Sequence, residues 1–372
     1  MSKLTVLLGA GFSAPIGMPL GKDIQIRFDR DQRNMLLVAS SSEWFWVDKK
    51  NETFIHNGKI NSQNIYYSYI VNELVKFYKE EKGSFIDYED FFEYLITKFE
   101  QKDGWLNHIY VVAKKSLFED YPNWNTPQAL DYNPYLNDEP SVYRLISIIN
   151  HLIADLLNIK ITEDQLIKSY TFFLNYIMKF DDVSIFTLNH DLILERTLEV
   201  FGLKYSRGFS DNKSTVFFED TKLPVFKNNF QNEKIKIFKM HGSLDYYRYN
   251  TDNYFNYFTT TNYRAKHYAQ IRNPMTNEVI SEFNTDIVPR FITGKDKPKI
   301  INNDYMYSKL FERFGDEISS TENLLVSGYS FGDEHINKEL MKRNDIKIIN
   351  QNPFNKYPFS GNIKDINEFI EL

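Results

Sequence analysis

Three short polar clusters in the sequence hold residue types suited to acid–base chemistry. They are Asn189 to Asp191, His241 to Ser243 and Gly328 to Asp333, and each follows an apolar run typical of a buried parallel strand. A histidine that titrates near neutral pH can act as a general base, and an asparagine amide can both donate and accept a hydrogen bond. Because functional residues of open parallel sheets lie beyond the carboxyl ends of the strands, we expect the three clusters to converge there.

A glycine loop follows another apolar run, near the N-terminus. Gly9, Gly11 and Ala14 have the G-x-G-x-x-G/A spacing of a dinucleotide-binding loop. A dehydrogenase would continue with a long helix and a second strand that ends in an acidic residue about 20 positions further on. Here Pro15 and Pro19 interrupt the stretch instead. The spacing therefore indicates a nucleotide loop that serves a reaction other than hydride transfer, and the G-x-x-x-x-G-K-[ST] pattern of a P-loop ATPase does not occur.

Each polar residue in these clusters also has an ordinary structural explanation. Asn189, Asp191 and Asp333 could each cap the helix that follows them. A single histidine such as His241 is more often a satisfied structural residue than a catalyst. The joint placement of these residues at predicted strand ends favours a shared site.

The elements that must position the clusters have the pattern of a parallel α/β sheet. Short apolar runs bounded by polar residues or glycine predict buried strands. The predicted strands are Leu4–Leu8, Val183–Leu188, Ile235–Met240, Leu324–Ser327 and Ile346–Ile349. Helical periodicity dominates between the first two of them, with helices predicted over 87–100, 142–157 and 163–180. We therefore predict an α/β fold, a Rossmann-like parallel sheet with a large helical insertion at about residues 30–181.

This pattern also sets the expected domain organisation. We expect residues 1–350 to form one nucleotide-binding domain that includes the insertion, and residues 351–372 to form a C-terminal tail. The helix predicted over 142–157 is apolar on more than one face, which indicates either deep burial or a subunit contact. Residues 250–284 are rich in Asn, Thr and Tyr with little periodicity, so we expect a long loop region of the kind that forms lids.

Composition excludes several kinds of site and partner. With 0 Cys, the chain holds no disulfide, no thiolate-bound zinc or iron–sulfur centre and no cysteine nucleophile. Asp333 and His335 are close in sequence, but two residues do not make a metal site, so we expect no metal. A net charge of −6 and a pI near 5.8 provide no basic footprint, which argues against direct nucleic-acid binding.

Hydropathy favours a cytoplasmic protein with no membrane contact. No apolar stretch reaches the roughly 18 residues that a membrane span requires. The apolar run at the N-terminus is short and broken by glycines, which favours a buried strand over a signal peptide. Hydrophobic residues make up 42% of the chain and aromatic residues 16%, which is enough to form a packed interior.

Together, the motifs resemble the sirtuin-like NAD-consuming family, and in particular the zinc-free sirtuin-like NAD hydrolases of bacterial anti-phage defence systems. The matching segments occur in the order typical of the family: GAGFSAPIGMP (9–19), TLNHD (187–191), KMHGS (239–243) and SGYSFGD (327–333). The segment IDYEDFFEYL (86–95) is similar to one common among bacterial members.

The resemblance implies that residues 1–350 are a sirtuin-like NAD-binding domain that cleaves the bond between nicotinamide and ribose. By this resemblance Asn189 would contact the ribose or the attacking water, and His241 would be the general base. Asp191 would help to hold the nicotinamide carboxamide. The remaining dinucleotide contacts implied by the family are Gly9, Ala10, Gly11, Phe12 and Ser13 in the glycine loop, and Gly328 and Ser330 on the phosphate and adenosine-ribose side.

Departures from the sirtuin pattern favour water as the acceptor. Protein-deacylating sirtuins usually carry a four-cysteine zinc module, which this chain lacks, and they have glutamine where Leu188 stands. The segment GMPLGKD (17–23) lacks their arginine-bearing loop. We therefore expect NAD to be the substrate of a hydrolysis that yields ADP-ribose and nicotinamide.

Two other functions remain open from the sequence. A regulatory subunit that binds NAD or ADP-ribose without cleaving it would keep the glycine loop but tolerate loss of Asn189 and His241. A deacylase or ADP-ribosyltransferase would need a groove for an acceptor protein. The family resemblance also implies an effector that depletes cellular NAD during phage infection, as a homo-oligomer with a separate partner such as a HerA-type ATPase or a short Argonaute.

Overall fold

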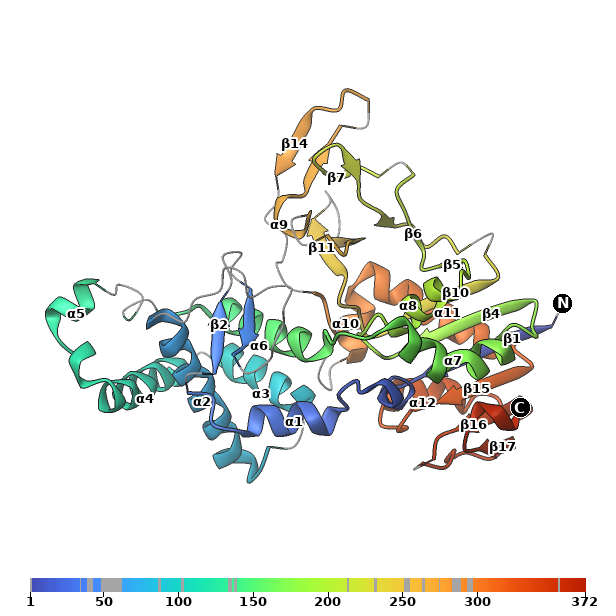
Figure 1. The fold of residues 1–372 in the computed structure, drawn as a ribbon, viewed down its shortest axis with the longest axis horizontal. Coiled ribbons are helices and arrows are strands. Elements are labelled where there is room, and N and C mark those ends of the chain that lie inside the picture. The colour runs from blue at the N-terminus through green and yellow to red at the C-terminus, as the bar shows by residue number, and fades with distance from the viewer. Residues whose placement is uncertain are drawn as a thin grey trace. The chain divides into compact units, whose positions relative to one another are not determined.

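The computed structural model divides the chain into two compact units (Figure 1). It describes residues 2–33, 35–38, 43–47, 62–85, 88–101, 104–132, 136, 139–212, 214–230, 233–250, 255–262, 265–273, 275–282, 289–292, 297–353 and 355–372. Unit 1 comprises Met1–Leu20, Ile159–Ile292 and Lys297–Leu372, and unit 2 comprises Gly21–Asn158 with Thr293–Asp296. The helical unit thus spans a shorter stretch than the insertion expected at about 30–181, and the domain limits read from the sequence stay a prediction.

Unit 1 is built on a seven-stranded sheet in which all strands are parallel. In sheet order the strands are β17 (Asn362–Ile366), β16 (Lys347–Gln351), β15 (Asn323–Ser327), β1 (Lys3–Leu8), β4 (Asp182–Thr187), β10 (Ile235–Lys239) and β5 (Tyr205–Ser206). The central strands are buried apolar runs, as expected where both faces of a sheet are covered. The predicted α/β, Rossmann-like fold is therefore confirmed, and every strand predicted from the sequence belongs to this sheet. Strand β17 lies within the segment expected to be a tail.

Strand register brings the polar clusters to one edge of the sheet. Leu8 of β1 pairs with Thr187 of β4 on one side and with Ser327 of β15 on the other. Thr187 pairs in turn with Lys239 of β10. Because these strands end level with one another, the loops that follow them start side by side.

Aromatic packing fixes the sheet against its helices. Phe186 of β4 stacks on Phe238 of β10 with ring centroids 4.5 Å apart, and Phe314 of α11 (Tyr305–Ser320) meets Phe186 edge-on at 4.9 Å. Burial of each such ring stabilises the fold by about 1.5–3 kcal/mol. The other helices in the described part of unit 1 are α7 (Glu163–Ile177), α8 (Ile193–Val200), α9 (Ala265–Tyr268), α10 (Lys297–Asn303) and α12 (Glu334–Leu340). Its 3₁₀ turns are η1 (Ala10–Phe12), η2 (Ala14–Ile16) and η6 (Phe369–Glu371).

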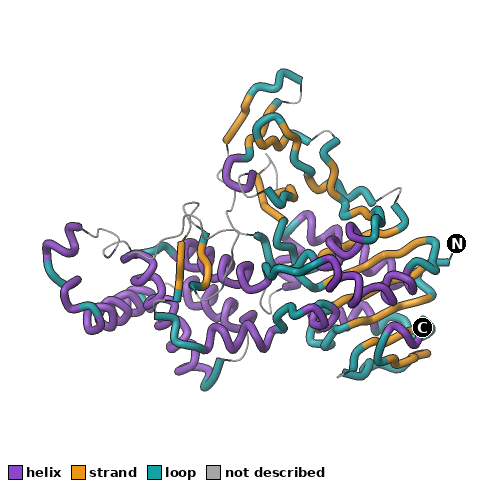
Figure 2. Tube along the Cα trace, viewed as in Figure 1, coloured by secondary structure: helices purple, strands orange, loops and turns teal. Residues whose placement is uncertain are grey.

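Two small antiparallel sheets complete unit 1, which Figure 2 shows in orange between helices and loops. One has the order β11 (Tyr246–Asn250), β12 (Phe255–Thr259), β9 (Val225–Phe226), β6 (Phe209–Ser210). The other has the order β14 (Val279–Glu282), β13 (Gln270–Arg272), β7 (Val216–Phe218), β8 (Thr221–Lys222).

The expectation of a long loop region over 250–284 is wrong for its described residues. They contain β12, β13, β14 and the short helix α9 (Ala265–Tyr268). The strands are short, and in β12 the consecutive residues Asn256, Tyr257 and Phe258 are all buried. Buried side chains on both faces remove the alternation by which a half-exposed strand is recognised.

Unit 2 is mainly helical, with one small hairpin. Its elements are α1 (Gly21–Asp29), β2 (Leu36–Val38), β3 (Trp44–Trp46), α2 (Ser62–Lys82), α3 (Tyr88–Gln101), α4 (Trp105–Asp120), η4 (Pro122–Trp124), α5 (Pro127–Tyr132) and α6 (Val142–Leu157). Helix α6 is buried along much of its length, which agrees with the first explanation of its apolar faces and leaves a subunit contact a prediction. Helix α3 begins at Tyr88, and positions 86 and 87 of the segment 86–95 lie outside the described residues. In the described part of the chain, no helix is long and apolar enough to cross a membrane.

Candidate functional site

The glycine loop packs directly on the loop that follows β15. The amide of Gly9 donates to the carbonyl of Ser327 at 2.9 Å, and the amide of Gly11 donates to the carbonyl of Gly328 at 2.9 Å. A Cβ on Gly9 would lie 2.6 Å from the Gly328 carbonyl oxygen, and one on Gly11 would lie 2.8 Å from the Gly328 Cα. The contact between the two backbones therefore requires glycine at both positions, whether or not a ligand binds there.

Asn189 ties the loop after β4 to the glycine loop. Its Nδ2 donates to the carbonyl of Gly9 at 3.0 Å and to Ser13 Oγ at 3.2 Å. Ser13 also hydrogen-bonds the carboxylate of Asp191 through its side chain. Since both side-chain hydrogen bonds that Asn189 makes among the described residues use Nδ2, the carbonyl Oδ1 remains to accept from a ligand.

Asp191 is buried and takes a structural position at the start of α8. Its Oδ1 accepts from the backbone amide of Ile193 at 2.9 Å, which satisfies one of the free amides at that helix end. Burial raises the pKa of the Asp191 carboxyl, while nearby Lys239 acts in the opposite direction. Asp191 thus stabilises the helix start from the position before the N-cap residue Leu192, and the predicted contact with nicotinamide stays a prediction.

His241 is buried at the end of β10, and only 3% of its surface is exposed. Burial lowers the pKa of its imidazole well below the usual range, and the charge of Lys297 acts in the same direction. Its Nε2 is buried and has no hydrogen-bond partner among the described residues. His241 is therefore neutral at pH 7, and it presents a nitrogen that can accept a proton.

His190 follows Asn189 in the chain and packs against Phe291, with ring centroids 4.5 Å apart and the ring planes tilted by 38°. Burial lowers its pKa to about 3, assisted by the charges of Lys239 and Lys297. The backbone carbonyl of His190 accepts from the amide of Leu244 at 2.9 Å, so the loops after β4 and β10 are joined.

Asp333 lies at the N-cap position of α12, but its side chain makes no capping hydrogen bond there. Lys297 Nζ instead lies 2.7 Å from Asp333 Oδ1. The same carboxylate oxygen is 4.0 Å from Nε2 of His241, and His335 follows in the first turn of the helix. The capping explanation is thus wrong for Asp333, because its carboxylate turns to Lys297 and the histidines.

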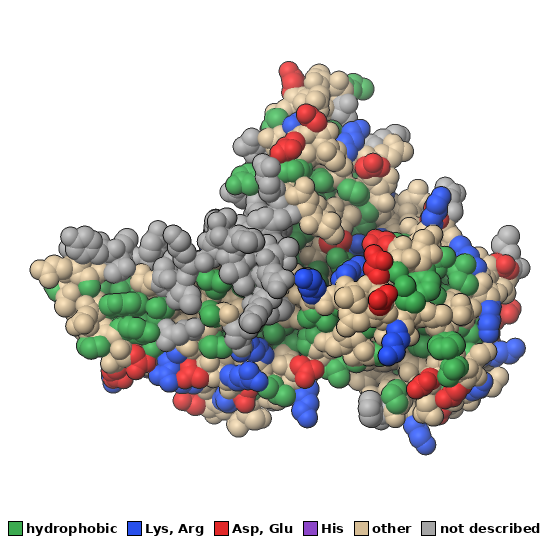
Figure 3. Space-filling model, in the orientation of Figure 1, with side chains coloured by type: hydrophobic (Ala, Val, Ile, Leu, Met, Phe, Trp, Pro, Cys, Tyr) green, Lys and Arg blue, Asp and Glu red, His purple; other side chains and the backbone are tan. Residues whose placement is uncertain are grey.

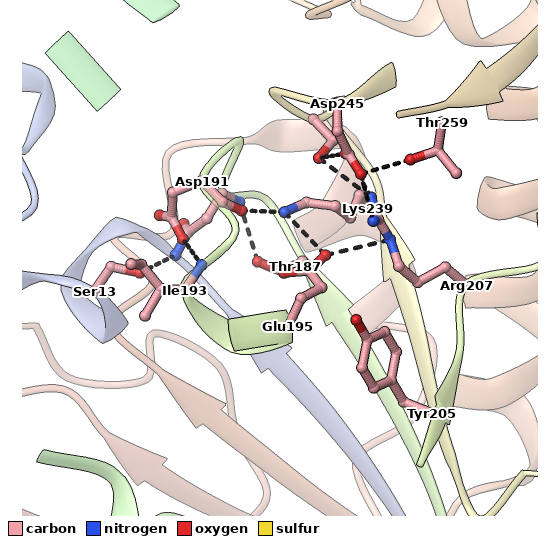
Figure 4. Close-up of polar contacts among 12 residues, drawn as sticks. Ser13, Thr187, Asp191, Ile193, Glu195, Tyr205, Arg207, Lys239, Asp245 and Thr259 are labelled. Atoms are coloured by element: carbon pink, nitrogen blue, oxygen red, sulfur yellow. Dashed lines mark hydrogen bonds and ion pairs between the residues drawn. The ribbon is translucent and has the colours of Figure 1, made fainter. Parts of the chain in front are cut away.

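A chain of buried charges supports the loop after β4 (Figure 4). Lys239 hydrogen-bonds the backbone carbonyl of Asp191, and its Nζ is 3.3 Å from Glu195 Oε1. Arg207 Nε also lies 3.3 Å from Glu195 Oε1. The same guanidinium binds both carboxylate oxygens of Asp245, at 2.7 and 2.8 Å. Two basic and two acidic side chains therefore alternate, so each of these buried groups lies beside one of opposite sign.

Further hydroxyl donors hold Asp245 in its ionised form. Ser243 Oγ donates at 2.6 Å and Thr259 Oγ1 at 2.5 Å. Burial alone would raise the pKa of Asp245, but Arg207 and these hydroxyls lower it below its usual value. The carboxylate thus stays charged throughout the ordinary pH range.

The remaining predicted contacts divide between the loop surface and the core. Ala10 and Ser330 are exposed, so their positions are open to a ligand. Phe12 is buried, packs on Tyr170 and Phe173 with ring centroids 4.9 Å away in each case, and accepts a hydrogen bond from the Tyr170 hydroxyl on its carbonyl. The side chain of Phe12 therefore serves the core of unit 1.

Several residues of this region were not found from the sequence. Lys239 lies within the segment KMHGS but was read as part of a strand, and Glu195 and Arg207 belong to no motif. Lys297 is 36 positions from Asp333 in the chain. The one signal in the sequence is Lys239, because a lysine inside a predicted buried strand that leads to a polar cluster indicates a buried charge with a partner.

A cavity of about 510 Å³ lies elsewhere in unit 1. Residues around it include Asp245, Thr259 and Asn262, and its lining contains none of Asn189, His241 and Gly328. On the face drawn in Figure 3, Lys and Arg side chains are interspersed with Asp and Glu.

Comparison with known proteins agrees with this arrangement. No curated protein matches the chain. Residues 183–348 match the family model of the SIR2-like domain. The matched range begins at β4 and includes all three polar clusters, and the glycine loop precedes it. Over residues 183–348 the chain is therefore similar to SIR2-like domains, a sirtuin-like family whose members are commonly NAD-dependent enzymes.

Proposed function

We propose that the chain is an NAD⁺ glycohydrolase that cleaves the nicotinamide–ribose bond of NAD to give ADP-ribose and nicotinamide. One observation carries the proposal: Asn189 and His241 follow the adjacent strands β4 and β10 at one edge of the sheet, where Asn189 also binds the glycine loop. An amide and a neutral imidazole at neighbouring strand ends suit a reaction on a sugar of a bound dinucleotide.

The chemistry needs orientation more than acid catalysis. Nicotinamide leaves as a neutral molecule when the electron pair of the broken C–N bond passes to its ring nitrogen. The barrier lies in the oxocarbenium character that develops on the ribose, as in other glycosidic reactions. Water then forms the new bond to C1′ and gives up a proton. In our proposal Oδ1 of Asn189 orients the ribose or this water, and Nε2 of His241 takes the proton.

The protonation state of His241 supports its role as a base. Because its pKa is lowered, the imidazole is unprotonated at pH 7, which is the form that a general base requires. A positioned base of this kind typically contributes about 10²- to 10⁴-fold in rate. The absence of cysteine removes the sirtuin zinc module and supports water over an acylated lysine as the acceptor.

The test is product formation by purified protein and its variants. We expect nicotinamide and ADP-ribose to appear together on chromatography of the wild-type reaction, and His241→Ala and Asn189→Ala to lose about 100-fold or more of that rate. Asn212→Ala and His108→Ala, at exposed positions outside the site, are the matched controls and should retain it. Folded His241→Ala and Asn189→Ala proteins with wild-type rates would overturn the proposal. A parallel reaction that contains an acylated peptide detects deacylation, because a deacylase would remove the acyl group from the peptide.

A second candidate function is a subunit that binds NAD or ADP-ribose without cleaving it. The hydrogen bonds from Asn189 to Gly9 and Ser13 favour it, because they give Asn189 a structural reason to be present. Calorimetric binding of ADP-ribose together with an absence of nicotinamide release would support this alternative.

The biological setting that we propose follows from the resemblance to anti-phage effectors. In it the chain acts in the cytoplasm, assembles as a homo-oligomer and depletes NAD when a separate partner, such as a HerA-type ATPase or a short Argonaute, releases its activity. The expected result is a fall in cellular NAD after phage infection in cells that carry the wild-type chain, and none with His241→Ala. Equal NAD levels in both would contradict this role.

A further inference from the structure

Three side chains that can ligate a metal converge beside the proposed site. His241 follows β10, whereas Asp333 and His335 stand at the start of α12. One ligand atom from each lies within 4.8 Å of the other two. Asp333 Oδ1 is 4.0 Å from Nε2 of His241, and the centroids of the two imidazole rings are 5.8 Å apart. The residues thus form a compact group from separate elements.

Both imidazoles of this group hold an unsatisfied nitrogen. Nε2 of His241 and Nε2 of His335 are each buried, with no hydrogen-bond partner among the described residues. A buried polar atom without a hydrogen-bond partner is destabilising, so two such atoms that face the same small group of ligating side chains favour an occupant. The proposed reaction explains the free nitrogen of His241 but leaves that of His335 without a role.

We propose that His241, Asp333 and His335 bind a Zn²⁺ ion reversibly, and that the bound ion inhibits NAD hydrolysis by occupying Nε2 of His241. The inhibitory part rests on the function proposed above, whereas the metal site stands on its own geometry. Two imidazoles and one carboxylate, with a fourth position open to water, form a donor set typical of zinc. Magnesium and calcium prefer oxygen ligands throughout, which makes them poor candidates.

Lys297 explains why this site would be reversible. Its Nζ lies 2.7 Å from Asp333 Oδ1, so an incoming ion must displace an ammonium group from that carboxylate. Asp333 is 20% exposed, which gives the ion a path from solvent. Competition with a buried lysine lowers the affinity of the site relative to a resident structural zinc.

The binding test requires no NAD. Metal-free protein is titrated with ZnCl₂ in a calorimeter, and with CoCl₂ while the visible absorption typical of tetrahedral Co²⁺ is recorded. We expect one ion per chain. His335→Gln removes a direct ligand, so it should weaken zinc binding by about 10–100-fold or more, the loss seen when a residue that only supports a ligand is removed. Lys297→Met should strengthen binding because it removes the competitor, and His108→Gln, at an exposed position, is the matched control.

Zinc inhibition is then measured separately on NAD hydrolysis. Each variant is compared with its own zinc-free rate, and His335→Gln should raise the inhibitory zinc concentration by the same factor as its dissociation constant. Zinc binding that His335→Gln leaves unchanged, or no binding at all, would overturn the site whether or not NAD is cleaved. Binding with the expected variant pattern in a protein that cleaves no NAD would uphold the metal site and reject the enzymatic function alone.

Discussion

At the scale of single residues, the glycines have a cause that the motif did not predict. The G-x-G spacing indicates room for a phosphate, yet Gly9 and Gly11 are already needed because the backbone of Gly328 lies against them. Gly328 itself has φ of 64°, in the left-handed region that favours glycine. Two glycine-containing segments at opposite ends of the chain thus depend on each other, so neither would tolerate a side chain on its own.

Gly328→Ala should destabilise unit 1 strongly. The added Cβ would lie 2.1 Å from the amide nitrogen of Phe12 and 2.4 Å from the carbonyl carbon of Gly11, and it would also strain the backbone. Overpacking and left-handed strain together cost roughly 2–5 kcal/mol. Gly17→Ala is the matched control, because its φ is 85° with nothing within 4 Å of the new Cβ, and it should cost only about 1–2 kcal/mol. Urea denaturation measures the free energy of unfolding of both variants, and an equal loss of stability in the two would refute the packing argument.

At the scale of elements, the central sheet was predictable because its strands are buried on both faces. Runs rich in apolar residues mark β1, β4, β10 and β15, and the polar residues that follow them indicate the site. Strand β17 was missed because most of its residues are exposed and polar. Pairings between distant positions, such as Lys297 with Asp333, leave no local pattern, so they could be found only from the fold.

Lys239→Met should destabilise the protein by about 3–5 kcal/mol, because it removes one cation from a buried set of charges and leaves Glu195 partly uncompensated. It also removes the contact that holds the Asp191 carbonyl, so NAD hydrolysis should fall as well. Lys364→Met, at an exposed strand position, is the matched control and should change stability little. The double variant Lys239→Met with Glu195→Gln should recover part of the loss in urea denaturation. No recovery would show that the charges of Lys239 and Glu195 are not coupled.

At the scale of the whole molecule, the two units carry different spectroscopic reporters. All four tryptophans, Trp44, Trp46, Trp105 and Trp124, belong to unit 2. The parallel sheet and the buried His190 and His241 belong to unit 1, whereas the buried His151 belongs to unit 2. Tryptophan fluorescence therefore reports the unfolding of unit 2, whereas far-UV circular dichroism reports both units, and a difference between the two signals can be assigned to unit 1.

Acid should weaken unit 1 through its buried neutral histidines. The pKa of His190 is about 3 in the folded protein, and that of an unfolded histidine is near 6.5. Between these pH values the unfolded chain binds a proton that the folded chain does not, so stability falls as pH falls below 6.5. From pH 6.5 to pH 5, protonation of this histidine in the unfolded chain lowers the free energy of unfolding by roughly 2 kcal/mol.

His190→Phe removes this titration and keeps an aromatic ring beside Phe291. We expect its unit 1 transition, followed by circular dichroism in urea, to lose about 2 kcal/mol less than wild type between pH 6.5 and pH 5. The fluorescence transition of unit 2 should show the same pH dependence in both proteins, because the substitution lies in the other unit. Identical pH dependence of the dichroism transition in the two proteins would mean that His190 is protonated in the folded state. A fluorescence transition that shifts together with the dichroism would instead show that the two units unfold as one.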